Sequence, residues 1–247
     1  MRALRVVLVV VVAIVAAIAL VPAAWLDQPL AARTHQRLRL VDADGLWWHG
    51  RGALTTADGG TRIPIAWRVA FAPLLGRTLA VDLEPGSDDA SPSGSLRAHG
   101  DTLELRDVRL RTPAALVTAF APALNALALG GDLALDARSM TWRGGNATGT
   151  LDATWRRARV VAGGLALDLG TVTLTAAPAG GRLAGTIRNS GGEVALDGTI
   201  DGGPAAIDVA LTLKPASGAP ESVRRMLPLL GPADGTGGVR IAWRSAR

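Results

Sequence analysis

The chain of 247 residues contains no cysteine and no tyrosine, and aromatic residues make up 4% of it. The absence of cysteine excludes a disulfide framework, a thiolate metal site and a cysteine nucleophile. The histidines, His35, His49 and His99, stand in unrelated contexts without metal-ligand spacing. The residue types on which metal binding and nucleophilic catalysis most often depend are therefore scarce.

Sequence motifs of the common catalytic and phosphate-binding sites are missing as well. There is no G-x-S-x-G nucleophile elbow, and the glycine-rich segments "GGNATG" and "GGPAAIDVAL" lack the spacing and the lysine of a phosphate loop. Acidic residues mostly alternate with apolar ones, which is typical of a solvated strand face. We therefore predict a protein that is not an enzyme and that has no cofactor and no metal; a hydrolase would need polar residues to converge on one sheet edge.

The charge balance does not indicate nucleic-acid binding. Lys and Arg number 26 against 21 Asp and Glu, giving a net charge of +5, but the arginines are scattered along the chain. No basic run and no aromatic-rich basic motif accompanies them. We expect a mixed surface and no nucleic-acid partner.

The N-terminus carries one long apolar run. Residues 6–26, "VVLVVVVAIVAAIALVPAAWL", contain no charge, and as a helix they would span about 30 Å, the thickness of a bilayer's hydrocarbon core. Trp25 falls where an interfacial anchor would lie. The sequence predicts a cytoplasmic start (1–5), a single transmembrane signal anchor (6–26) and an exported domain (27–247). A signal peptide cleaved near "VPAA" is the alternative.

Beyond the apolar run, short alternating segments broken by Gly, Asp and Pro predict a mainly β, largely antiparallel domain. In "AAIDVALTLKP" the apolar residues share one face, as expected of a sheet covered on one side. Alternation changes phase at Gly170 and again between Leu105 and Val108, and the second change indicates a β-bulge.

Two segments predict short helices instead. In the segment 112–131, Thr112 is a plausible N-cap, Pro113 would take the first helical position, and Gly130 could end the helix. The segment 219–232 offers a short amphipathic helix, which would group four apolar residues: Val223, Met226, Leu227 and Leu230.

A tryptophan repeat runs through the domain. "IAWR" at 65–68 returns as "ATWR" at 153–156 and as "IAWR" at 241–244, and a Trp followed by glycines precedes the first two. These tryptophans could fill the core or cover an edge of a repeated β unit. Alternatively, some contact a partner or the membrane surface. Since adjacent strand residues point to opposite faces, Trp47 and Trp48 cannot both be buried in a one-layer core, so they are the candidate partner contact.

The order of these motifs resembles the type II secretion system protein N family. The resemblance rests on the single anchor, "GLWWHGRGAL", "IPIAWRVAFAPLLGRTLAVDL", "LNALALGGDLALD", "MTWRGGNATGTLDATWRRA" and the closing "MLPLLGPADGTGGVRIAWR". It implies an accessory inner-membrane component that helps to export folded proteins from the periplasm across the outer membrane. It also implies a curved antiparallel sheet, similar to AsmA-like proteins, and no catalytic residues.

Two functions are therefore expected to compete. The first is an interaction protein, with its domain in the periplasm and other type II secretion components and the inner membrane as partners. The second is a lipid-binding or apolar-ligand-binding module, because a curved sheet with one apolar face and few covering helices could hold acyl chains.

Overall fold

Successive strands of the domain pair with each other almost without exception. The computed structural model describes residues 19–57, 59–86, 91–120, 127–162, 165–202, 206–232 and 238–245. Over these residues the strands form one 14-stranded sheet in sequence order from β1 to β14, with β8 attached beside β7. Every pairing is antiparallel, so the prediction of a mainly β, antiparallel domain is confirmed.

The strands are mostly long, and the helices between them are short. The strands are β1 (Leu38–Leu46), β2 (His49–Thr56), β3 (Arg62–Val69), β4 (Thr78–Leu83), β5 (Ser93–His99), β6 (Thr102–Pro113), β7 (Ala128–Arg143), β8 (Asn146–Thr148), β9 (Leu151–Ala162), β10 (Leu165–Ala179), β11 (Arg182–Ser190), β12 (Val194–Gly202), β13 (Ile207–Pro215) and β14 (Val239–Ser245). The helical segments are η1 (Ala23–Leu26), α2 (Asp27–Arg33), α3 (Phe71–Leu75), η2 (Ala114–Leu116), α4 (Val117–Phe120), α5 (Glu221–Met226) and η4 (Leu227–Leu230).

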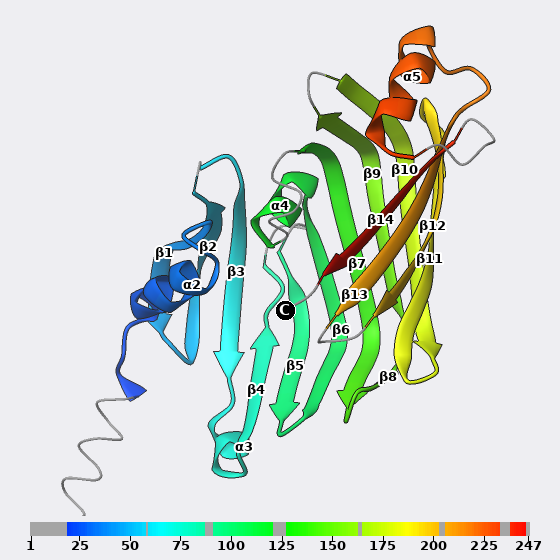
Figure 1. The fold of residues 1–247 in the computed structure, drawn as a ribbon. Coiled ribbons are helices and arrows are strands. Elements are labelled where there is room, and N and C mark those ends of the chain that lie inside the picture. Colours follow the sequence, from blue (N-terminus) through cyan, green and yellow to red (C-terminus); the bar gives the residue numbers. More distant parts are fainter. Residues whose placement is uncertain are drawn as a thin grey trace, which may run out of the picture.

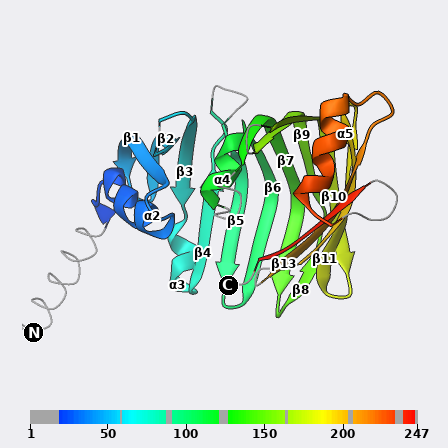
Figure 2. The same ribbon diagram turned by 45° about the horizontal axis from the view of Figure 1, so that its top comes forward.

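The sheet bends so that β13 and β14 stand in front of its middle strands, and α2, α4 and α5 lie on the concave side (Figures 1 and 2). The strand register places one set of alternating apolar residues on this concave face. At its C-terminal end Val223 and Leu227 of the α5–η4 segment are buried in the same cluster as Leu213. At its N-terminal end Leu116 of η2 packs with Leu38 of β1 and Ile63 of β3.

Both predicted changes of phase are β-bulges. The β9–β10 register shifts on either side of Gly170, which has a φ of 70°. A Cβ there would approach the carbonyl oxygen of Ser190 to 2.4 Å, so glycine is required by conformation and by space. In β6 the register against β5 shifts next to Asp107, which has a φ of 49°.

One of the two predicted helices is correct. The 219–232 segment forms α5 and η4, with Val223 and Leu227 buried as expected. The prediction for 112–131 is wrong at both ends, because Thr112 and Pro113 pair with β7 and Gly130 lies inside β7. The alternation of β6 continues through Thr112, and a proline can end a strand because the ladder needs no further N–H there. Helix is confined to η2 and α4, and residues 121–126 lie outside the described ones.

The predicted transmembrane segment, 6–26, lies mostly outside the described residues, which begin at Ala19. Leu20 is in a turn, Pro22 forms an isolated antiparallel bridge with Leu46, and Ala23 is fully buried. The end of the apolar run therefore belongs to the folded domain. Within the part of the chain that is described, no helix combines the length and the apolarity that crossing a bilayer requires.

Candidate functional site

Trp47 and Trp48 form the turn between β1 and β2. Leu46 pairs with His49, so the two tryptophans are the residues that connect the strands rather than adjacent strand positions. The interpretation of Trp47 and Trp48 as adjacent strand positions is therefore wrong. Both side chains are half-buried.

An aromatic cluster of Trp47, Trp48, Trp67 and Phe71 closes this end of the sheet. The ring centroid of Phe71 lies 5.8 Å from that of Trp47, in an edge-to-face arrangement, and 5.0 Å from that of Trp48. Such pairs contribute about 0.5–1.5 kcal/mol beyond their buried area. The cluster is thus a stabilising element in its own right.

The polar groups of the aromatic cluster hold the chain that enters the domain. Trp48 Nε1 donates to the carbonyl oxygen of Ala19 at 2.9 Å, and Trp47 N donates to Val21 O at 3.1 Å. Trp67 Nε1 in turn donates to Trp47 O at 2.9 Å. These bonds join the end of the apolar run to the first hairpin of the sheet.

Asp27 forms a second connection at the same end. Its Oδ1 accepts from Arg39 Nε at 3.0 Å and from Leu40 N at 2.8 Å, and Arg39 Nη2 lies 2.6 Å from its Oδ2. The hydrogen bond from Arg39 is the main reason that the pKa of Asp27 lies below its ordinary value, and the Leu40 N–H contributes further. Helix α2 is thereby fixed against the outer edge of β1.

Apolar side chains are exposed at this end, beside the point where the chain enters. Trp25 is 70% exposed, Leu20 67% and Phe71 42%. Isolated apolar residues on a surface need no explanation, but three of the exposed large ones lie in or next to the entering segment and the aromatic cluster. Exposed apolar side chains therefore gather where the chain enters the domain.

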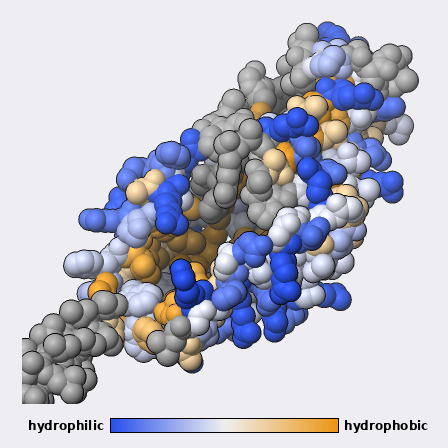
Figure 3. Space-filling model, turned by 60° about the horizontal axis from the view of Figure 1, so that its bottom comes forward, coloured by the Kyte–Doolittle hydropathy of each residue, from blue (hydrophilic) through white to orange (hydrophobic). Residues whose placement is uncertain are grey.

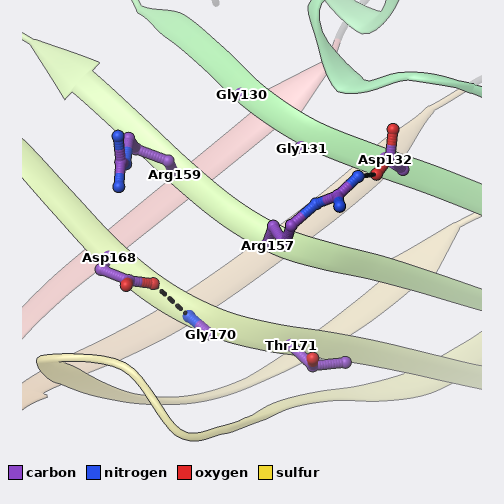
Figure 4. Close-up of a pocket in the computed structure, with 8 residues that line it drawn as sticks. All are labelled: Gly130, Gly131, Asp132, Arg157, Arg159, Asp168, Gly170 and Thr171. Atoms are coloured by element: carbon purple, nitrogen blue, oxygen red, sulfur yellow. Dashed lines mark hydrogen bonds and ion pairs between the residues drawn. The ribbon is translucent and has the colours of Figure 1, made fainter.

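A depression lies on another part of the sheet, where the registers of β7, β9 and β10 shift (Figure 4). It has a volume of about 640 Å³. Its carboxylates are already engaged, since Asp132 pairs with Arg157 and Asp168 accepts from Gly170 N at 2.8 Å. The depression is a shallow hollow in the sheet, in which Asp132 forms an ion pair with Arg157 and the carboxylate of Asp168 accepts a main-chain hydrogen bond.

The histidines do not assemble a reactive site. His35 lies in the turn after α2, His49 begins β2, and His99 ends β5, where its Nδ1 is 2.9 Å from Thr78 Oγ1. Across the described ranges no three His, Asp or Glu side chains gather to hold a metal ion.

The sequence profile of the type II secretion system protein N family matches residues 36–242. The chain belongs to this family. Comparison with curated proteins and with solved structures gave no match. The matched range begins just before β1 and ends in β14, so it covers the sheet of this type II secretion component except the last three residues of β14.

The tryptophan repeat of the secretion protein places its three members in different environments. Trp67 of β3 is buried, and Trp155 of β9 is half-buried and donates from Nε1 to Gly130 O at 2.8 Å. Trp243 of β14 is 37% exposed. The interpretation as core residues therefore holds for Trp67, and Trp155 also bridges neighbouring strands.

Two residues of the candidate site were missed by the sequence analysis. Asp27 is the first residue of the predicted exported domain, and Phe71 opens the short helix α3. Asp27 is the first acidic residue after the apolar run, and that position was the available signal. The position of Phe71 depends on the β1–β2 turn, which had been interpreted as strand.

Proposed function

We propose that this protein is an inner-membrane-anchored accessory of the type II secretion pathway whose β domain lies in the periplasm and contacts other secretion components. The observation that carries the proposal is the link between the tryptophans and Ala19–Val21. These residues lie near the end of the apolar run 6–26, so an anchor formed by the earlier residues of that run would continue directly into a domain held at the membrane surface.

The exposed side chains of Leu20, Trp25 and Phe71 support this placement. Tryptophan is enriched at the membrane–water interface, where its ring is apolar and its N–H reaches polar groups. The half-exposed surfaces of Trp47 and Trp48 lie on the same end of the sheet. We propose these two as a partner contact next to the membrane.

A chromosomal deletion tests the function. In a bacterium with the complete pathway, we expect a folded substrate to accumulate in the periplasm and to be secreted again after complementation with the wild-type gene. Complementation with Trp48→Phe should be nearly normal if packing alone matters, whereas Trp47→Ala with Trp48→Ala should fail. Normal secretion by the deletion strain would contradict the proposal.

The topology is tested separately. Alkaline phosphatase fused to the C-terminus is active only after export, so we expect an active fusion and an inactive one when residues 6–18 are deleted. An inactive fusion with the full chain would place the domain on the wrong side of the membrane.

Binding of a lipid or another apolar ligand is a second candidate. The concave face of β4 to β7 carries partly exposed apolar side chains, among them Val81, Leu96 and Leu105, and Figure 3 shows a hollow lined by apolar residues between hydrophilic rims. Helices bury the two ends of this face more completely than its middle. Native mass spectrometry of the detergent-purified full chain should then detect co-purified lipid, and its absence would remove this candidate.

A further inference from the structure

The sheet has two edge strands, and the outer edge of β1 is capped. Leu38 N donates to Thr34 Oγ1 at 3.2 Å, and Leu40 N donates to Asp27 Oδ1 at 2.8 Å. The register is broken between Val41 and Asp44, and Pro22 bridges to Leu46. A further strand could not be added here without displacing η1 and α2, because these caps use the edge groups that it would need.

Within the described ranges, no strand pairs with the outer edge of β14. Arg240 N donates outward to Pro232 O at 3.1 Å. Since outward-facing groups alternate along an antiparallel strand, the N–H and C=O of Ala242 and Arg244 also point away from β13. Among the described residues no main-chain group bonds to them, and Ala242, Trp243 and Arg244 are all exposed.

The side chains of β14 define what could pair with it. Ile241 and Trp243 are on the concave, apolar face, whereas Arg240 and Arg244 are on the other face. On that face β13 already offers Arg244 an acidic neighbour, because Asp208 pairs with it. A strand on the outer edge would complement β14 if apolar residues alternated with acidic ones.

A second copy of the chain fits this edge poorly. An antiparallel pair of β14 strands centred on Ala242 would set Arg240 opposite Arg244 of the other copy. Like charges directly opposite each other in a ladder are destabilising. Charge complementarity therefore favours a different polypeptide.

We propose that the outer edge of β14 binds an extended, alternating apolar and acidic segment of another polypeptide by strand addition. The added strand would continue the concave face, with its apolar side chains beside Trp243. This inference rests on the proposed function and deepens it, because it names the place and the chemistry of a partner contact.

The test uses the full chain in detergent micelles and a fluorescent peptide that copies residues 206–214, "AIDVALTLK", the sequence that pairs with β14 on its inner side. Fluorescence anisotropy should detect binding that is at least about tenfold weaker for Ala242→Pro, because proline removes the central outward N–H. Ala242→Ser keeps that N–H and should bind like the wild type.

Folding controls accompany the binding measurement. Ala242→Pro should unfold within a few degrees of the wild type, since its N–H makes no bond to β13 and proline is tolerated on the outer side of an edge strand. A peptide with Asp replaced by Lys should bind more weakly to the wild type, and Arg244→Glu should reverse this preference. Undetectable binding of the original peptide, or equal binding by Ala242→Pro, would overturn the proposal.

Different results would contradict the secretion role and the assignment of the β14 edge. Defective secretion after deletion, together with unchanged peptide binding by Ala242→Pro, would overturn the edge assignment and leave the secretion role intact. Normal secretion after deletion, together with peptide binding that Ala242→Pro abolishes, would overturn the secretion role alone.

Discussion

The same four residues, Ile-Ala-Trp-Arg, occupy β3 and β14 and have different environments there. Trp67 is 6% exposed and bonded to a main-chain carbonyl, whereas Trp243 is 37% exposed on an edge strand. The difference comes from their neighbours. Gly50 lies opposite Trp67 and leaves room for its ring, and the β1–β2 turn folds over it, while Trp243 has a neighbouring strand on one side only. Sequence identity within a repeat therefore did not determine burial.

The largest expected effect on stability comes from replacing the buried one of these two tryptophans. Trp67→Ala should lower the free energy of unfolding by about 3–5 kcal/mol, because it empties a buried site and removes the indole bond to Trp47. Trp243→Ala should cost less, about 1–2 kcal/mol, since Trp243 is 37% exposed on an edge strand. Urea unfolding of the full chain in micelles, followed by far-UV circular dichroism, measures both. Equal losses would contradict the assigned environments.

A substitution at Gly50 tests how closely the ring of Trp67 packs against β2. A Cβ at this position would lie 2.7 Å from Trp67 Cζ2 and 2.9 Å from Leu46 O, so Gly50→Val should destabilise by about 1–3 kcal/mol through overpacking. Gly218→Ala is the matched control, because a Cβ there meets nothing within 4 Å. The same urea titration compares them, and an unchanged midpoint for Gly50→Val would show that the turn is not packed against β3.

Loss of the Asp27 carboxylate, which caps the edge of β1, should have a smaller effect on stability, and this effect should depend on pH. Because the pKa of Asp27 is lowered in the folded chain from about 3.8, its contribution to stability is complete above the unfolded pKa and is lost as the pH falls through the folded pKa. Asp27→Asn should therefore cost about 1 kcal/mol at pH 7, and this cost should shrink as the pH falls below the ordinary pKa of a carboxyl group. Thermal unfolding across this range measures the difference. A constant difference at all pH values would contradict the role of the carboxylate.

Local sequence patterns predicted the features that depend on neighbouring residues. The change of phase between Leu105 and Val108 predicted a bulge, the one at Gly170 located a second irregularity, and the spacing of Val223 and Leu227 predicted α5. Alternation and helical periodicity are properties of a few consecutive residues. The same signals failed at Thr112 and Pro113, where a helix start and a strand end share the same residues.

The features that define the two edges could not be predicted in this way. A turn made of Trp47 and Trp48 lacks the Gly or Asn typical of a two-residue hairpin, so the sequence pattern predicts a strand at these positions. The bond from Leu40 N to Asp27 and the open edge at Ala242 depend on the order of strands in the whole sheet. Such long-range consequences of topology leave little trace in a short stretch of sequence.

The contrast between one closed edge and one open edge is the central claim, and residue-resolved amide hydrogen exchange of the full chain in micelles tests it most directly. We predict slow exchange at Leu38 and Leu40, whose N–H groups are capped, and fast exchange at Ala242 and Arg244, which slows when the residue 206–214 peptide is added. Slow exchange at Ala242 and Arg244 in the protein alone, or fast exchange at Leu38 and Leu40, would contradict it.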